Sequence, residues 1–290
     1  MRKTLFSGIA ACLLATAATA AEQSPSVIWT VGQADRSASE FALAPDRFRD
    51  FLANDFGYED KYFLVGHSVP AADFPYVLPG PADTWGGTWP TSGWRTHQIN
   101  ILFGLKEIPS DGTCTLVVDL LDYAKNFLPL VKVSVNTQDA KFQLDAPGLS
   151  VADQRKPNQM EKIVDTLSIT GNLAKATPRR LEIPIRPGVL KAGGNEVTIT
   201  VLEGSWILFD RVSLEGPAGT NVEQPQQLFI RNIEAAPYEL ADGKRRVQPL
   251  LVDLEWLEGA PALSVELDDK EILNLSLIHI SEPTRLGMIS

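Results

Sequence analysis

Short apolar stretches that alternate with polar residues recur along most of the chain. In the clearest case, Asn195–Glu203, every second residue is apolar: Val197, Ile199 and Val201. Successive side chains of a strand point to opposite faces, so this period of two predicts one buried and one solvent-facing side. Comparable stretches between turn-forming residues are SVIWTV, KYFLV, HQINILFGL, CTLVVDLL, VKVSV, KFQL, RLEIPI and WILFDRVSLEG. The pattern predicts an all-β chain folded as an antiparallel sandwich.

Two segments interrupt the strand pattern. Phe48, Phe51 and Leu52 lie at helical spacing and predict a turn or two of helix. Glu215–Gln227 is rich in Gly, Pro and Gln, and residues 218–227 are therefore predicted to form a linker. The strand-like stretches that follow, LFIRNIEAA, RRVQPLLVDLEWL and ALSVELD, predict the start of an immunoglobulin-like sandwich over residues 228–274, cut short before its core is complete.

Neither end of the chain is expected to belong to the mature fold. Residues 1–20 have a basic start, a short apolar run and small residues before Ala21, which predicts a cleaved signal for export to the periplasm or outside the cell. The apolar run is too short to span a membrane. Residues 275–290 contain LSLIHISEPTR, which resembles the translation of a sequencing adapter, so this tail is predicted to be an artefact on a truncated natural protein.

The net charge and the cysteine content exclude some classes of function and of covalent structure. The formal net charge is −10, so nucleic acid is not an expected partner. Cys12 leaves with the signal and Cys114 then stands alone, which excludes an internal disulfide in the mature chain. No phosphate-binding glycine loop, nucleophile elbow or histidine-rich metal spacing is present. His67 and His97 are interpreted as structural donors at strand ends, and no catalytic residue is assigned.

The loop Tyr76–His97 contains the sequence TWGGTWPTSGWRTH, with three tryptophans among turn-forming residues. Such rings either fold onto the core or are displayed, and both can hold within one loop. Trp94 directly precedes a strand and is predicted to be buried. Displayed indole rings can stack on the apolar face of a sugar while nearby polar groups bind its hydroxyls. The candidate ligand-binding residues are Trp85, Trp89, Arg95, His97, Tyr76, Asp73 and Asp83.

Calcium is a second candidate ligand, in a structural role. The sequence DRSASE provides Asp35 and Glu40, and Asp210 lies elsewhere in the chain. No run of alternating oxygen ligands of the calcium-loop type is present, so a metal site is not assigned.

Several stretches in the same order resemble the carbohydrate-binding-like third domain of polysaccharide lyase family 4, the rhamnogalacturonan lyases. They are IWTVGQADRSASEF, KYFLVGHSVPAADFPYV, THQINILFGL, VKVSVN and GVLKAGGNEVTITVLEGSWILFDRVSLEGP, which together run from about Ile28 to Pro217. The resemblance implies a galactose-binding-like jelly roll over residues 26–217. In that family catalysis belongs to an N-terminal domain, whereas here the module begins directly after the signal. A polar insertion and the tryptophan-rich loop depart from the family pattern, so the ligand need not be the same.

These observations predict an exported, non-catalytic carbohydrate-binding module from a larger protein that degrades plant polysaccharides such as pectin. The expected partner is a plant cell-wall oligosaccharide or polysaccharide, with a catalytic domain C-terminal to the truncated chain. Two alternatives remain open. The same chain can carry lyase or glycoside hydrolase activity, or it can be a structural spacer without a ligand.

Overall fold

The computed structural model describes residues 26–58, 60–87, 97–108, 113–145, 167–243, 245–259, 262–267 and 270–276. Strands make up most of its regular structure, and the all-β fold class is confirmed. The predicted signal at 1–20 and all but the first two residues of the 275–290 tail lie outside the described residues, as do Trp89, Trp94 and Arg95.

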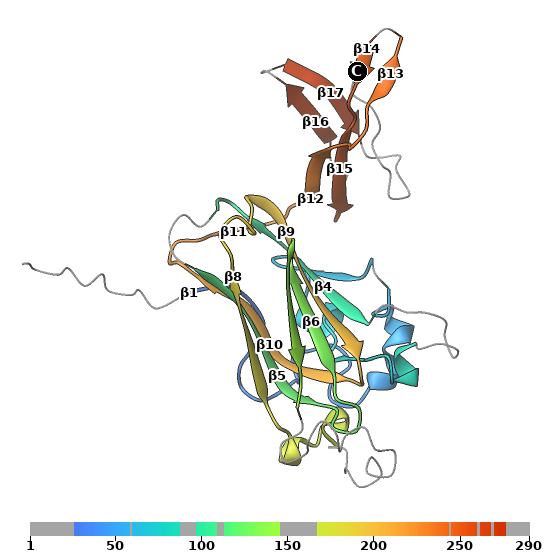
Figure 1. The fold of residues 1–290 in the computed structure, drawn as a ribbon, viewed down its shortest axis with the longest axis vertical. Coiled ribbons are helices and arrows are strands. Elements are labelled where there is room, and N and C mark those ends of the chain that lie inside the picture. Colours follow the sequence, from blue (N-terminus) through green and yellow to red (C-terminus); the bar gives the residue numbers. More distant parts are fainter. Residues whose placement is uncertain are drawn as a thin grey trace, which may run out of the picture.

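Among the described residues, the first sandwich consists of eleven strands and short connecting helices, and Figure 1 shows how they are arranged. The strands are β1 (Ser26–Gly32), β2 (Tyr62–Leu64), β3 (Val77–Leu78), β4 (Gln98–Leu105), β5 (Cys114–Tyr123), β6 (Leu130–Val135), β7 (Gln138–Gln143), β8 (Arg179–Ile185), β9 (Gly193–Glu203), β10 (Ile207–Gly216) and β11 (Val222–Glu223). The helical segments are α1 (Pro70–Asp73) and five 3-10 turns: η1 (Phe48–Asp50), η2 (Leu52–Asn54), η3 (Thr84–Gly86), η4 (Leu167–Thr170) and η5 (Leu173–Lys175).

Two sheets face each other across the core of this sandwich (Figure 1). The β10 sheet has the order β1-β10-β5-β8, and β3 also pairs with β10. The β9 sheet has the order β11-β4-β9-β6-β7, and β2 pairs with β4. Among the described strands of these two sheets, every pairing is antiparallel except the short parallel pairing of β2 with β4. Strands that follow one another in the sequence often lie in opposite sheets. Loops that are far apart in the sequence consequently lie together at each end of the sandwich.

The alternating residues of β9 point into the core, as their period predicts. Val197 and Ile199 are 0% exposed and Val201 is 1% exposed. Each pairs with inward residues of the flanking strands, for example Ile199 with Ile99 of β4 and Val133 of β6. Burying such a side chain completely contributes about 1.5–3 kcal/mol, so this inner face holds the two sheets together.

The predicted helical interruption is present but forms 3-10 turns. Phe48 begins η1 and Leu52 begins η2, with Phe51 between them. Phe51 is fully buried and its ring lies 5.8 Å from that of Phe56. The apolar spacing is therefore used to attach this short segment to the core, although no side chain caps either turn.

After β11 the chain enters a second group of strands, β12 (Leu228–Ala235), β13 (Leu240–Asp242), β14 (Arg245–Val247), β15 (Leu250–Trp256), β16 (Ala262–Leu267) and β17 (Lys270–Ser276). They pair as three two-stranded sheets: β12 with β15, β13 with β14 and β16 with β17. We call this group the second module. The boundaries predicted for it and for the linker stay predictions.

The second module contacts the β9 sheet through β12. Phe229 is 6% exposed and packs with Leu64 of β2 and Leu102 of β4. Arg231 reaches Glu196 of β9 at 3.4 Å and Glu255 of β15 at 3.0 Å. An apolar contact and a charged contact thus join the two parts. No helix in the part of the chain that the structure describes is long and apolar enough to cross a bilayer.

Candidate functional site

Asp73 and Tyr76, two residues of the predicted sugar site, lie just before and at the start of the tryptophan loop and make hydrogen bonds within the fold. Asp73 ends α1, and its Oδ2 accepts the backbone N–H of Val69 at 2.8 Å. Tyr76 is 1% exposed, and its hydroxyl donates to the carbonyl of Ile169 at 2.6 Å. Burial raises the pKa of the Tyr76 hydroxyl, which keeps it a neutral donor. Tyr76 therefore lies in the core, which differs from its expected place on an exposed rim.

Asp83 fastens the tryptophan loop to the turn between β9 and β10. Its Oδ2 accepts the N–H of Gly80 at 2.8 Å, and its Oδ1 accepts the hydroxyl of Ser205 at 2.5 Å. The backbone N–H of Ala82 also donates to the carbonyl of Gly204 at 2.9 Å. Asp83 is 8% exposed, so both carboxylate oxygens are used inside the fold rather than at the surface. This arrangement makes Asp83 a residue that positions the loop.

Trp85 is half-buried and packs edge-on against two phenylalanine rings. Its centroid lies 5.1 Å from that of Phe48 and 6.1 Å from that of Phe51, with interplanar angles of 75° and 81°. Part of the indole therefore belongs to a small aromatic cluster at the end of the sandwich, and part remains accessible. Packing of the ring against the core is therefore observed, and its use as a surface for a ligand stays a prediction.

His97 begins the path into β4 next to the tryptophan loop. Its carbonyl accepts the N–H of Val201 at 2.9 Å, and a side chain added at Gly86 would lie 3.8 Å from its Cε1 atom. Its Nδ1 atom is buried without a hydrogen-bond partner among the described residues. Burial lowers the pKa of the imidazole below its ordinary value, which favours the neutral ring. The imidazole of His97 therefore lies close to Gly86 of the tryptophan loop.

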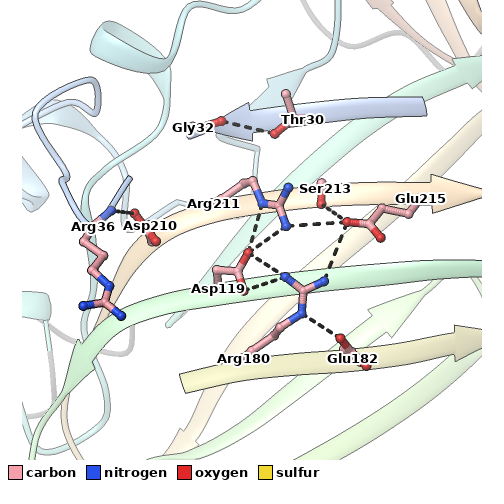
Figure 2. A network of polar contacts seen from close by, with 10 residues as sticks. All are labelled: Thr30, Gly32, Arg36, Asp119, Arg180, Glu182, Asp210, Arg211, Ser213 and Glu215. Carbon is pink, nitrogen blue, oxygen red and sulfur yellow. Dashed lines mark hydrogen bonds and ion pairs between the residues drawn. The ribbon is translucent and has the colours of Figure 1, made fainter. Parts of the chain in front are cut away.

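The structure brings together the three carboxylates named for calcium. Asp210 Oδ1 accepts the N–H of Arg36 at 3.0 Å (Figure 2), and Glu40 Oε1 accepts the N–H of Gln33 at 2.9 Å. Burial raises the pKa of Asp210 to about 6, and the charges of Asp35 and Glu40 contribute to the shift. Nevertheless, no set of three or more His, Cys, Asp or Glu side chains in the described ranges is arranged to hold a metal ion.

A charge network crosses three strands of the β10 sheet (Figure 2). Arg211 Nε donates to Asp119 Oδ2 at 2.9 Å, and Arg180 Nε donates to Glu182 Oε1 at 2.6 Å. Arg180 also reaches Asp119 at 3.3 Å, while both arginines approach Glu215 at 3.8 and 3.5 Å. Both guanidiniums are therefore matched by carboxylates and join β8, β5 and β10 rather than presenting an anion site. The sequence signal for this network was the alternation of polar residues, Arg180 and Glu182 on β8 and Arg211, Ser213 and Glu215 on β10.

One comparison with known proteins, the match to a family model, supports the fold. The family model described as the CBM-like domain III of polysaccharide lyase family 4 matches residues 27–214. Among solved structures, a family GH115 4-O-methyl-α-glucuronidase with specificity for decorated arabinogalactans is 18% identical, with a TM-score of 0.24. The match covers 40% of this chain and 13% of that enzyme's chain. A comparison with curated protein sequences gave no significant match.

Proposed function

The chain belongs to the CBM-like domain III family of polysaccharide lyase family 4, and from this premise we propose that it binds a plant cell-wall polysaccharide without acting on it. In this proposal the protein is exported, and its sandwich attaches a polysaccharide-degrading protein to its substrate. Binding to a polymer with many repeated sites raises the local concentration of the attached protein, so a single site need not be tight.

One observation carries the proposal: the family match extends from the start of β1 to near the end of β10. It therefore includes β1 to β10, which is all of the first sandwich except the short β11, rather than a local motif. A shared fold does not by itself establish a shared ligand. The ligand-binding role consequently has to be tested on particular side chains.

The proposed site is the tryptophan loop and its surroundings. Trp85 keeps an accessible part, and the proposal also assigns stacking to Trp89 and polar contacts to Arg95, Asp73 and His97. Tyr76 and Asp83 support the loop from within through their contacts with Ile169 and Ser205. Stacking on one ring face supplies on the order of 1 kcal/mol beyond the buried area, by analogy with aromatic pairs.

The charge of the protein favours neutral glycans. With a net charge of −10, the protein repels a galacturonate backbone at long range, whereas galactan and arabinan side chains carry no charge. We therefore expect neutral pectic side chains to bind more tightly than polygalacturonate. The difference should shrink as salt is added.

The test is a titration of soluble galactan, arabinan and rhamnogalacturonan into the wild-type protein, followed by calorimetry and tryptophan fluorescence. The expected dissociation constant is about millimolar to micromolar. The Trp85→Ala, Trp89→Ala double variant should bind at least about tenfold more weakly, because two stacking contacts are lost. Trp256→Ala removes a tryptophan that is 42% exposed on the second module, and it should bind like the wild type.

Trp85 also contacts Phe48 and Phe51, so the melting temperature of each variant has to be measured alongside binding. Equal affinity of the folded double variant would exclude this loop as the site. A folded wild-type protein that binds none of the glycans would support a structural spacer instead. Release of unsaturated or reducing sugar ends from these glycans would support the enzymatic alternative.

A further inference from the structure

Three loops meet at the turn Gly204–Ser205, which joins β9 to β10. The backbone N–H of Ser205 donates to the carbonyl of Phe127 at 2.9 Å, while its hydroxyl donates to Asp83 at 2.5 Å. Gly204 has a φ of +84°, and a Cβ atom at this position would collide with the carbonyl of Leu128. The turn therefore holds the tryptophan loop on one side and the loop Ala124–Pro129 on the other.

The loop Ala124–Pro129 is also fixed at both of its ends. The N–H of Ala124 donates to the carbonyl of Trp206 at 3.0 Å, and the carbonyl of Pro129 accepts the N–H of Leu144 at 3.1 Å. Lys125 is 7% exposed, and its Nζ contacts Asp122 Oδ1 at 2.7 Å. This loop consequently has a well-defined backbone, although it contains no helix or strand.

Phe127 is exposed at the centre of this fixed loop. Its exposed fraction is 48%, whereas its immediate neighbours are half-buried, and Lys125 and Pro129, two positions away on either side, are buried. A phenylalanine whose backbone is fixed and whose ring meets solvent loses little conformational freedom when a ligand covers the ring. The core of the sandwich is closed without it, so the fold does not account for an aromatic residue at this position.

Polar side chains lie on the strands that pair with Leu130, three residues after Phe127. Leu130, which follows the loop, pairs with Glu203 on β9 and with Gln143 on β7. Glu203 and Gln143 are both exposed, and Glu203 directly precedes the turn that holds the Phe127 loop. Gln143 Nε2 donates to the carbonyls of Pro129 and Leu144, both at 3.3 Å, so the groups offered to sugar hydroxyls are the Glu203 carboxylate and the Gln143 amide oxygen. The loop's own cation, Lys125, is buried against Asp122 and does not offset the charge of Glu203.

We propose that Phe127 is a second aromatic platform of the glycan site, on which a neutral sugar ring stacks while Glu203 and Gln143 bind its hydroxyls. This inference rests on the proposed function, because it assumes that the protein binds a glycan. Ser205 hydrogen-bonds to Phe127 through its backbone and to Asp83 of the tryptophan loop through its hydroxyl. The proposal therefore places Phe127 and the tryptophan loop at the same end of the sandwich, as parts of one binding site. The carboxylate of Glu203 favours a neutral ring over a uronate at this position.

The experiment compares wild type, Phe127→Ala, Phe127→Trp and Tyr238→Ala in titrations with soluble galactan and arabinan. Tyr238 is 51% exposed and lies on the second module, so it controls for the loss of an exposed aromatic ring. Phe127→Ala should weaken binding about fivefold to tenfold. Phe127→Trp should restore or strengthen binding, and Tyr238→Ala should leave it unchanged. All four melting temperatures should agree closely, because neither ring belongs to the core.

The outcomes of this experiment distinguish a failure of the Phe127 platform from a failure of the proposed glycan-binding function. If the wild type binds a glycan and Phe127→Ala binds it equally well, Phe127 is not a platform, although the proposed function stands. The same conclusion follows if Phe127→Ala and Tyr238→Ala weaken binding equally. If the folded wild type binds neither galactan nor arabinan, the Phe127 platform for a neutral sugar ring fails, and the titration with rhamnogalacturonan then decides the proposed function separately.

Discussion

At the scale of single residues, the folded protein disfavours the ionised form of the Asp210 carboxyl group. Burial, together with the nearby charges of Asp35, Asp119 and Glu40, raises the pKa of this carboxyl group from 3.8 to about 6, although the N–H of Arg36 opposes the shift. The folded protein therefore binds the proton more tightly than the unfolded chain does. This contribution to stability is fully present below about pH 4 and is lost as the pH rises through about 6.

Asp210→Asn should stabilise the protein at neutral pH, because the amide oxygen can still accept the N–H of Arg36 without carrying a charge. The expected gain in the free energy of unfolding is about 1–2 kcal/mol at about pH 7.5, less than the full shift in pKa would give, since some solvent reaches the group. At about pH 4, where the native carboxyl is already protonated, the gain should be small. Urea denaturation at both values measures this. An equal gain at both would assign the effect to something other than the proton on Asp210.

At the scale of elements, the short turn between β9 and β10 contacts both the tryptophan loop and the loop Ala124–Pro129. Gly204 and Gly219 both adopt positive φ values, +84° and +92°, so a side chain strains the backbone at either position. They differ in surroundings: a Cβ at Gly204 would meet the carbonyls of Leu128 and Phe127, whereas nothing lies within 4 Å of one at Gly219. The two glycines therefore separate backbone strain from loop packing.

Gly219→Ala should cost about 1 kcal/mol from strain alone, and Gly204→Ala should cost about 1–3 kcal/mol more, because it also pushes the loop Ala124–Pro129 away. Thermal or urea unfolding of both variants tests the difference. If the Phe127 platform exists, Gly204→Ala should also weaken glycan binding, whereas Gly219→Ala should not. Equal destabilisation of the two variants would mean that the turn does not hold the loop.

At the scale of the whole molecule, the second module is attached to the sandwich by a small mixed interface. Phe229 supplies its apolar part with Leu64 and Leu102, and Arg231 supplies its charged part with Glu196. A side chain at Gly194 would collide with the carbonyls of Ile230 and Arg231, so β9 and β12 approach with no room for a Cβ. This contact sets the direction in which the chain leaves the proposed binding module.

Phe229→Ala should loosen the second module while leaving the first sandwich folded, because the ring lies outside the main core cluster. We expect cleavage within residues 218–227 by a nonspecific protease to be about threefold faster or more, as local opening becomes easier. Ile233→Ala is the matched control, since Ile233 lies on the same strand and is 55% exposed. Unchanged cleavage of Phe229→Ala relative to Ile233→Ala would show that the interface does not fix the module.

The sequence by itself determined the sandwich, because the period of a strand is local: Val197, Ile199 and Val201 are assigned to one face by their spacing alone, and all three are buried. Spacing carries no information about contacts between distant residues. Asp83 and Ser205 are 122 positions apart, and their hydrogen bond exists because antiparallel strands return three loops to the same end. For the same reason Tyr76, which the sequence makes a candidate ligand-binding residue, lies in the core, while the exposure of Phe127 has no signal in the local sequence pattern. Local patterning therefore decided which faces are buried, and the tertiary structure decided which side chains meet at the candidate site.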